Sequence, residues 1–237
     1  MKAAGVNHYA MAMNILLAMA VSVPFYTGEA LTYKVKYGFI SAGEMTLRVL
    51  ENEDKNGITC WHFRLKADGG IPFYDVKDEI HSWVSVADFA TVYYQKDINE
   101  GSYHKNTWIS YDPSNYRAVY PEGDTVDIPK GALDPLAVFY YARKLNLEEG
   151  KTYWVPYHVD RRSEMMKVEV KKKEKVKVPY GEFDCYLVEP KVSTGKNIFG
   201  AKGGLKIWFT ADDQKLPIKV ETQVFFGSMT AELKAKE

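Results

Sequence analysis

The chain has 237 residues, of which 46% are hydrophobic and 26% are charged, so it is long and apolar enough to bury a core. Its 31 Lys and Arg residues equal its 31 Asp and Glu residues, which gives a formal net charge of zero at pH 7. No overall electrostatic field favours nucleic acid or an anionic membrane surface. The composition therefore argues against a nucleic-acid-binding protein.

The first predicted element is an export signal over residues 1–26. Lys2 supplies a positive start, Ile15–Leu17 lies in an apolar centre, and Ala18–Ala20 offers a small-x-small cleavage site. The apolar run is shorter than the roughly 20 residues of a membrane span. A retained anchor and a buried first helix are the alternatives.

We expect the remainder, residues 27–237, to be a single mostly-β domain that is exported to the periplasm. It would be soluble there or associated peripherally with the outer membrane. Neither cysteine follows the signal at the position of a lipid-modified N-terminal residue, so a lipoprotein is disfavoured.

Alternation of apolar and polar residues predicts a strand over Leu31–Tyr37 with one buried face. Gly38–Gly43 would turn the chain, and Leu31–Leu50 as a whole is typical of a hairpin. Ile58–Lys66 forms the next predicted strand. Three antiparallel strands in sequence indicate a meander.

Many further short strands follow, separated by turn residues such as Asp-Pro and Gly-Asp. The pattern predicts a mainly β fold: a large antiparallel sheet or partly closed β-barrel with one α-helix packed against it. The predicted strands are Lys77–Val86, Thr91–Lys96, Ser102–Tyr111, Tyr116–Tyr120, Lys151–Val159, Met165–Val178, Asp184–Pro190, Gly204–Phe209 and Ile218–Phe226.

One segment is convincingly helical. Asp134 is a good N-cap and Pro135 suits the first helical position. Apolar residues follow at helical spacing, and Glu148–Gly150 would end the helix. We expect this helix to cover one face or one end of the sheet.

The Lys-rich run Lys167–Lys177 places valines on one parity and lysines on the other. This pattern is typical of a solvated strand face in which Lys protects a sheet edge. The alternatives are an anion-binding or polysaccharide-binding stripe and an exposed edge that docks a structural partner.

The two cysteines, Cys60 and Cys185, could pair in an oxidising compartment. Strand alternation points Cys60 outward, with His62, and Cys185 inward, with Phe183. The facing therefore argues against a disulfide.

Acidic, histidine and aromatic residues gather between Tyr74 and Trp83, which makes this segment the best candidate for ligand binding. On a strand, Glu79, His81 and Trp83 share one face, and Asp78 lies on the other. Glu79 and His81 could act as metal ligands or as an acid/base pair, although two ligands are too few for a metal site. The alternative is an exposed strand face of mixed charge. The candidate ligand-binding residues are Tyr74, Asp78, Glu79, His81 and Trp83.

No catalytic residue and no cofactor or metal is predicted. The chain has no Gly-x-Ser-x-Gly elbow, and His62, His104 and His158 occur singly, without evident partners. Gly200–Gly204 is glycine-rich but precedes a strand, so it is typical of a hairpin loop rather than a phosphate site.

The plentiful aromatic residues fit two arrangements. They could fill the core between sheet and helix, or some could line an apolar cavity that holds a lipid, an acyl chain or a glycan. We therefore expect a non-enzymatic envelope protein that binds an apolar or amphipathic ligand. An envelope polysaccharide hydrolase using Asp78 and Glu79, and a structural docking protein, are the alternatives.

Several motifs, in order, resemble one family. They are Gly28–Tyr33, Gly38–Gly43, Asp134–Leu136 running into Tyr140–Arg143, Gly181–Tyr186, Ile207–Asp213 and Leu216–Ile218. Together they resemble the exported bacterial family filed as domain of unknown function 3108. The resemblance covers nearly the whole mature chain and implies an envelope protein of Gram-negative-type bacteria with a mostly antiparallel β fold. It implies no activity and no site residues.

Overall fold

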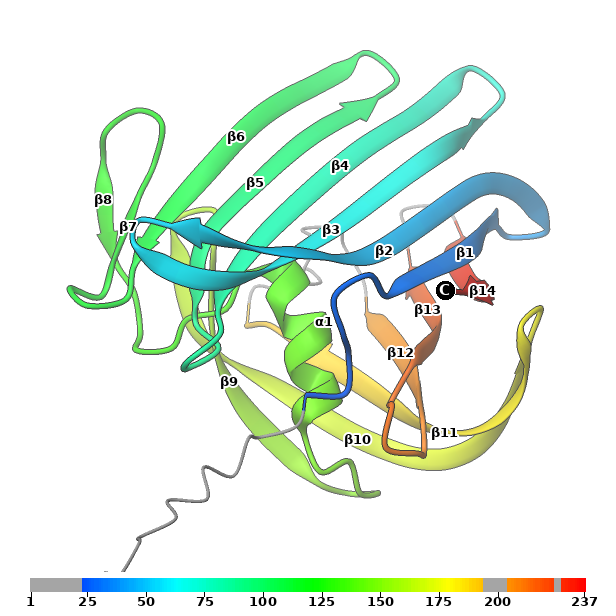
Figure 1. Cartoon of the computed structure of the whole chain (residues 1–237). Helices are drawn as coiled ribbons and strands as arrows, with labels where there is room; N and C mark the ends of the chain where they lie inside the picture. The colour runs from blue at the N-terminus through cyan, green and yellow to red at the C-terminus, as the bar shows by residue number, and fades with distance from the viewer. Residues whose placement is uncertain (1–22, 194–203, 224–226) are drawn as a thin grey trace, which may run out of the picture.

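The computed structural model describes residues 23–193, 204–223 and 227–237. Within them, fourteen strands form one antiparallel sheet that curves around a single helix (Figure 1). This arrangement confirms the predicted mainly β class. The strands are β1 Ala30–Tyr37, β2 Ile40–Lys55, β3 Ile58–Ile71, β4 Tyr74–Ser85, β5 Thr91–Glu100, β6 Tyr103–Asp112, β7 Arg117–Val119, β8 Thr125–Asp127, β9 Thr152–Val159, β10 Arg162–Val178, β11 Gly181–Lys191, β12 Leu205–Thr210, β13 Pro217–Gln223 and β14 Ser228–Lys236.

The order of strands in the sheet follows the chain in two runs. One run goes from β8 back to β1 and the other from β14 back to β9, and the two meet where β1 pairs with β14. In that ladder Leu31 lies opposite Lys236, and Tyr37 lies opposite Met229. Strands β8 and β9 are left at the two edges, and no ladder among the described residues joins them. The sheet is therefore strongly curved but not closed.

Side chains bridge the two edges of the sheet at a contact that we call the seam. Arg161, in the β9–β10 turn, donates from Nε to Asp124 and from Nη2 to Glu122, in the β7–β8 loop, each over 2.8 Å. The hydroxyl of Tyr120 lies 2.8 Å from Nε2 of His158. The seam consists of these five residues.

The helix α1, Pro135–Lys144, begins where the sequence predicts. The carboxylate of Asp134 accepts hydrogen bonds from the backbone N–H groups of Leu136 and Ala137, as an N-cap does. The predicted end at Glu148–Gly150 is wrong, because the helix stops at Lys144. Extended backbone after that point lets Leu147 reach the core, and this burial outweighs continued helical hydrogen bonding.

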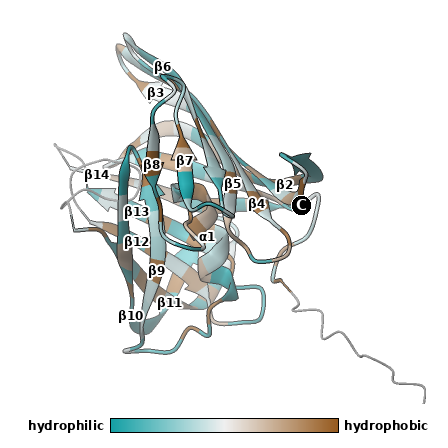
Figure 2. Cartoon of the chain, turned by 90° about the vertical axis from the view of Figure 1, so that its left-hand side faces the viewer, coloured by the Kyte–Doolittle hydropathy of each residue, from teal (hydrophilic) through white to brown (hydrophobic). Residues whose placement is uncertain are grey.

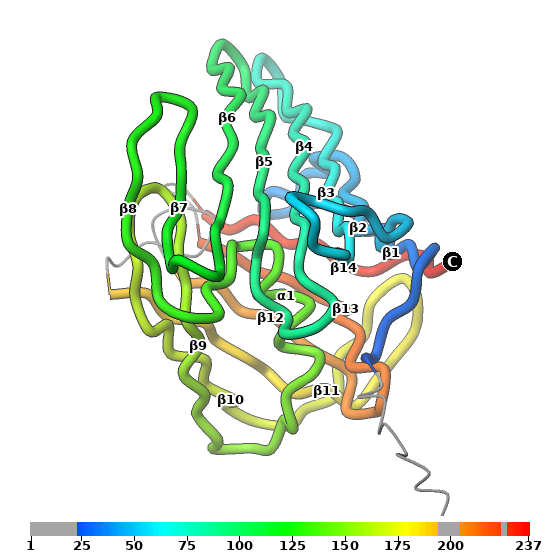
Figure 3. The backbone as a smooth tube through the Cα atoms, turned by 60° about the vertical axis from the view of Figure 1, so that its left-hand side comes forward, coloured from blue at the N-terminus to red at the C-terminus, as the bar shows by residue number. Residues whose placement is uncertain are grey.

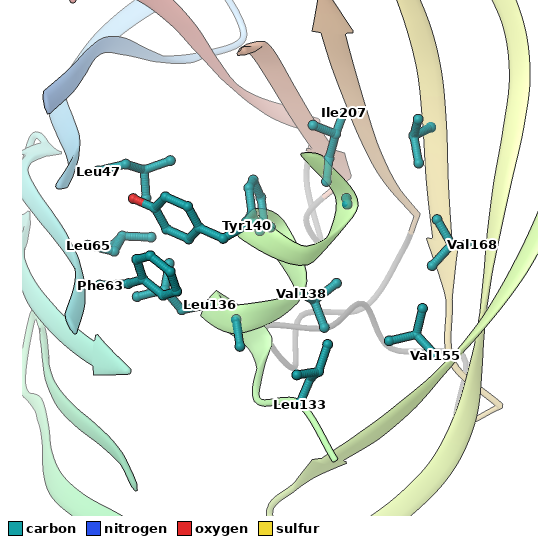
Figure 4. Close-up of a cluster of buried hydrophobic side chains, with 14 of the residues drawn as sticks. Leu47, Phe63, Leu65, Leu133, Leu136, Val138, Tyr140, Val155, Val168 and Ile207 are labelled. Atoms are coloured by element: carbon teal, nitrogen blue, oxygen red, sulfur yellow. The ribbon is translucent and has the colours of Figure 1, made fainter. Parts of the chain in front are cut away.

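The core lies between the helix and the concave face of the sheet (Figure 4). The rings of Phe63 and Tyr140 stack with centroids 3.8 Å apart. On the other side of the helix, Val138 faces the side chains of Val155 and Val168 (Figure 4). Figure 2 shows apolar and polar residues alternating along the strands, which is why one face of each strand can join this core.

The segment before β1 is part of the fold. Phe25 is buried, and its ring meets those of Phe63 and Tyr140 edge-on at 5.4 and 5.3 Å. Glu29 forms a buried ion pair with Arg143 of α1. Residues 23–26, which the predicted signal segment includes, thus contact the domain. The remainder of that segment lies outside the described residues.

Two strands escaped prediction, and both depend on partners. Strand β8 has three residues and is held by its pairing with β7. Strand β14 carries the alternating inward residues Ala231 and Leu233 and completes the sheet between β13 and β1. The predicted strand over Ile218–Phe226 is β13, and its last three residues lie outside the described part, as does most of the predicted loop Gly200–Gly204.

Gly43 lies within β2 rather than in the predicted turn. It is opposite Gly69 of β3, and a Cβ atom on Gly43 would lie 2.3 Å from the carbonyl oxygen of Asp68. A Cβ on Gly69 would lie 2.0 Å from the carbonyl oxygen of Ala42. The two glycines therefore allow an unusually close approach of two strand backbones.

The Lys-rich run lies in β10. Strand β9 pairs with β10 only as far as Glu169, so Lys171–Val178 has a strand neighbour on the β11 side alone. The predicted sheet edge is confirmed for that stretch. A register shift between Val170 and Lys172 interrupts the predicted single alternation of valine and lysine.

Both cysteines are free, as their predicted facing implies. Cys185 belongs to the main core, whereas Cys60 packs with Trp83 and Val92 in a small cluster on the outer face. Cys60 points outward but is covered rather than exposed. Of the described residues, no helix is long and apolar enough to cross a membrane.

Candidate functional site

A cavity of about 490 Å³ lies inside the curved sheet, between α1 and the ends of the hairpins. Apolar side chains form most of its wall. Those from strands β1 to β6 and the helix are Val35, Met45, Leu47, Leu65, Ala67, Ile80, Tyr94, Ile98, Tyr103, Pro135 and Phe139. Those from strands β9 to β14 are Val159, Leu205, Val220, Met229 and Ala231. The cavity thus combines residues from almost the whole chain.

Strand register explains why the wall is apolar. Leu65 on β3 lies opposite Leu47 on β2 and Ile80 on β4, so the inward positions of three neighbouring strands form one row. Ala67 lies opposite Met45 in the next inward row. Because Ala67 is small, the space in front of it stays open and belongs to the cavity.

The helix closes one end of the cavity. Pro135 and Phe139, on its first turns, contribute to the cavity wall. Their position depends on Asp134, which is buried and accepts hydrogen bonds from Ser82 on β4 and Thr91 on β5 as well as from the helix itself. One carboxylate therefore attaches the start of the helix to the sheet.

Five charged side chains also line the cavity. They are Asp78, Lys96, Glu100, Lys105 and Asp160. Lys96 pairs with Asp160 over 3.1 Å. Burial raises the pKa of Asp78 to about 6, and the neighbouring carboxylate of Glu100, which hydrogen-bonds to it, adds to this rise. The cavity therefore has a mostly apolar wall with some charged side chains. Of these, Asp78, Glu100 and Lys105 lie nearest to the β3–β4 and β5–β6 turns, at the end that we call the mouth.

The candidate residues between Tyr74 and Trp83 are divided between the two faces of β4, as alternation predicts. Asp78 lines the cavity. Tyr74 lies at the end of the β3–β4 hairpin, is 43% exposed, and donates to Glu100 over 3.1 Å. Glu79, His81 and Trp83 lie on the outer face. The structure therefore does not bring the five residues into one site.

The outer-face residues form a hydrogen-bonded network with neighbours that the sequence does not reveal. Nδ1 of His62 lies 2.9 Å from Glu53, and its Nε2 lies 2.7 Å from Nδ1 of His81. Nε2 of His81 lies 3.1 Å from Glu79, and the indole of Trp83 donates to Glu53. Burial lowers the pKa of both histidines.

This network corrects the expectation that the histidines stand alone. His62 pairs with His81, and His158 bonds to Tyr120 and Ser163. Every ring nitrogen of His62 and His81 already has a protein partner. In the described part of the chain, no group of three or more His, Cys, Asp or Glu side chains could hold a metal ion.

Sequence reasoning missed most of the cavity wall, above all the contributions of β13 and β14. Val220 on β13 lies opposite Ala231 on β14, and both line the cavity. The alternation of Met229, Ala231 and Leu233 was the available signal. It gives a strand but not its place between β13 and β1, which requires the sheet order.

Comparison with known proteins agrees with the fold. The sequence model of the family described as "Protein of unknown function (DUF3108)" matches residues 32–234. No curated protein matches the chain. The predicted resemblance to this family is confirmed.

Three solved structures are similar in shape. A β-barrel-like protein of domain of unknown function DUF1849 from Brucella abortus has a TM-score of 0.60 at 11% identity, over 91% of this chain and 99% of its own. A DUF1089 family protein from Pseudomonas aeruginosa has a TM-score of 0.44 at 14% identity, over 77% and 90%. A candidate exported protein with a YmcC-like fold from Bacteroides fragilis has a TM-score of 0.38 at 11% identity, over 91% and 98%. The first of these supports the fold alone.

Proposed function

The chain belongs to the DUF3108 family of proteins of unknown function, and we propose that it binds an apolar or amphipathic ligand, such as a lipid or a lipid-linked glycan, inside its curved sheet. One observation carries the proposal. It is the cavity of about 490 Å³, whose wall is mostly apolar and whose mouth carries charged side chains. Its volume lies within the roughly 300–1,000 Å³ of small-molecule sites.

The distribution of polarity favours an amphipathic ligand. Side chains such as Leu47, Leu65 and Val220 make most of the wall apolar. Lys96, opposite Ile80 on β4, is paired with Asp160. An acyl chain there would exchange water for apolar contacts along its whole length. Lys105 and the carboxylates of Asp78 and Glu100 would then meet the polar end of the ligand at the mouth.

The carboxylates are poorly placed for the alternative of a polysaccharide hydrolase. Asp78 lines the cavity, whereas Glu79 lies on the outer face beside His81 and Arg64. Asp78 and Glu100 do share the cavity, where Glu100 adds to the raised pKa of Asp78 and accepts a hydrogen bond from Tyr74. A binding function that involves no chemical step fits this arrangement better.

We also propose that the protein is exported and that its signal ends near Ala18–Ala20. Phe25 and Glu29 are buried parts of the domain, so a cut at residue 26 would remove a side chain from the core. A cut after Ala20 would leave both in place. N-terminal sequencing of the protein from the envelope fraction of its own cells checks this site.

The cavity is tested with 1-N-phenylnaphthylamine, a neutral apolar dye whose fluorescence rises in an apolar site. We expect the protein to bind it and Ala67→Phe to bind it at least tenfold more weakly, because the new ring would occupy the cavity. Lys66→Phe is the matched control, because Lys66, the residue before Ala67 on β3, points to the outer face. Thermal unfolding checks that both variants are folded.

Equal dye binding by wild type and Ala67→Phe would overturn the proposal. So would the absence of any binding by the wild type. Native mass spectrometry of the protein purified from its own envelope fraction then distinguishes an acyl lipid from a glycolipid by the mass that co-purifies.

A further inference from the structure

Two phenylalanine side chains at the tips of hairpins are completely exposed. Phe39 lies in the β1–β2 turn and Phe73 in the β3–β4 turn, and each has a relative exposure of 107%. Ile40, next to Phe39, is 55% exposed. These three residues, which we call the tip residues, make no apolar contact within their own core.

The two tips belong to the same end of the molecule. In a meander of antiparallel strands, the β1–β2, β3–β4 and β5–β6 turns all lie at one end of the strands. Figures 1 and 3 show the β3–β4 and β5–β6 hairpins side by side at that end, and in the view of Figure 2 they project beyond the rest of the sheet. The third turn is followed by Tyr103, which is 53% exposed and lines the cavity mouth.

Phe73 occupies a backbone conformation that suits glycine. Its φ angle is +69°, and it follows Pro72, so it stands at the third position of the four-residue β-turn 71–74, where glycine would be unstrained. A large side chain that gains no contact and costs backbone strain is unexplained by folding. Strain of this kind points to a function of the side chain.

The shape of this surface selects the partner. The tips are convex and separate, so they offer no groove to a peptide. Three apolar side chains cover far less than the roughly 800 Å² that each partner of a stable protein complex buries. A bilayer needs no complementary shape, because apolar side chains enter its interface one by one.

The charges near the tips are of both signs. Lys36 pairs with Glu232, and the carboxylates of Asp75 and Glu100 accompany Lys77 and Lys105. A mixed rim gives no preference for anionic lipid. Tyr74 and Tyr103 add rings with a polar end, as aromatic residues at membrane interfaces do.

We propose that Phe39, Ile40 and Phe73 insert into the surface of a phospholipid bilayer and hold the cavity mouth against it. Insertion does not depend on what the cavity binds. Because burial of one Phe ring is equivalent to roughly a tenfold to hundredfold gain in partitioning, two rings on one rigid sheet give measurable binding.

The test is co-sedimentation with phosphatidylcholine vesicles. The protein is purified from cells in the form in which it accumulates there. We expect Phe39→Ser with Phe73→Ser to lower the partition coefficient at least tenfold, with little dependence on salt. Trp154→Ser is the control, since Trp154 is 60% exposed on β9, away from the tips, and its loss should leave partitioning unchanged. Phe73→Gly relieves the backbone strain but removes the ring, so it should weaken vesicle binding as well.

A second measurement reports insertion directly. Ser102→Cys, in the β5–β6 turn, is labelled with an environment-sensitive dye while the buried Cys60 and Cys185 stay unlabelled. Vesicles should shift its emission to the blue, and the shift should disappear in the double serine variant.

Unchanged vesicle binding by the double serine variant would overturn the proposal. A change in self-association by that variant, without any change in vesicle binding, would assign the tips to a second copy of the chain instead. Dye binding to the cavity in solution should be the same in wild type and variant, so failure of membrane docking and failure of the cavity are told apart.

Discussion

Arg143 and Glu29 form an ion pair that is almost completely buried, with side chains 1% and 2% exposed and Nη1 to Oε1 at 2.6 Å. The same guanidinium donates to the carbonyl oxygens of Pro24 and Gln214. It therefore connects three parts of the chain: the segment before β1, the helix and the β12–β13 loop. Because the two side chains are buried, water cannot replace either partner of the ion pair when the other is removed.

We predict that Arg143→Met lowers the free energy of unfolding by about 3–5 kcal/mol, because it leaves the carboxylate of Glu29 buried without its partner. Adding Glu29→Met should restore part of the loss. Lys36→Met is the control, since its pair with Glu232 is partly exposed and should matter by about 1 kcal/mol or less. Urea unfolding at pH 7 measures all three, and similar losses for Arg143→Met and Lys36→Met would contradict the prediction.

Among the elements, the weakest are the strands at the seam. β7 and β8 have three residues each, and β8 pairs on one side only. The β7–β8 loop is attached to the β9–β10 turn through Arg161, whose partners Glu122 and Asp124 are exposed. Exposed ion pairs add little to global stability, but here they join the loop of a short edge hairpin to the facing edge, beside the contact of Tyr120 with His158.

We predict that Arg161→Ala changes the free energy of unfolding by less than about 1 kcal/mol while hydrogen exchange in β7 and β8 becomes at least several-fold faster. Lys151→Ala, which removes an exposed ion pair with Glu148 elsewhere, is the control and should leave that exchange unaltered. Hydrogen exchange, measured by mass spectrometry on peptides from residues 113–128, tests this prediction. Uniformly unchanged exchange would show that the ion pairs do not hold the hairpin.

At the scale of the whole molecule, two buried groups make stability depend on pH in opposite directions. Burial raises the pKa of Asp134 to about 6, so its contribution is fully present below about pH 4 and is lost as pH rises through 6. Burial lowers the pKa of His158 to about 4, so its contribution is fully present above about pH 6.5 and is lost as pH falls through 4. Each effect amounts to up to about 3 kcal/mol.

We predict that substitutions at the two positions tilt the stability profile between pH 4 and pH 6.5 in opposite senses. Asp134→Asn should make stability rise more with pH than in wild type, and His158→Asn should make it rise less or fall. His104→Asn, at an exposed position, should leave the profile unchanged. Urea midpoints measured across this range give the slope of stability against pH for each variant. Equal slopes for Asp134→Asn and His158→Asn would contradict the prediction.

Most elements of the fold could be predicted from the sequence because their signals are local. Alternation in Leu31–Tyr37 gives β1, and Asp134 with Pro135 gives the start of α1. The short strand β8 and the end of α1 could not be predicted in this way. Both depend on what the rest of the chain offers: a partner strand for β8 and a place in the core for Leu147.

For the candidate site, what the sequence predicts and what the structure adds are easier to separate. The sequence by itself determined which residues of β4 share a face, since the side-chain period of a strand is two, and so it separated Asp78 from Glu79 and His81. Only the tertiary structure decided what each face meets: the cavity for Asp78, and Glu53 with His62 for the outer residues. The physical reason is that a cavity inside a curved sheet and a network across strands both consist of contacts between residues far apart in the chain. Their register is set when the sheet forms and has no local signal.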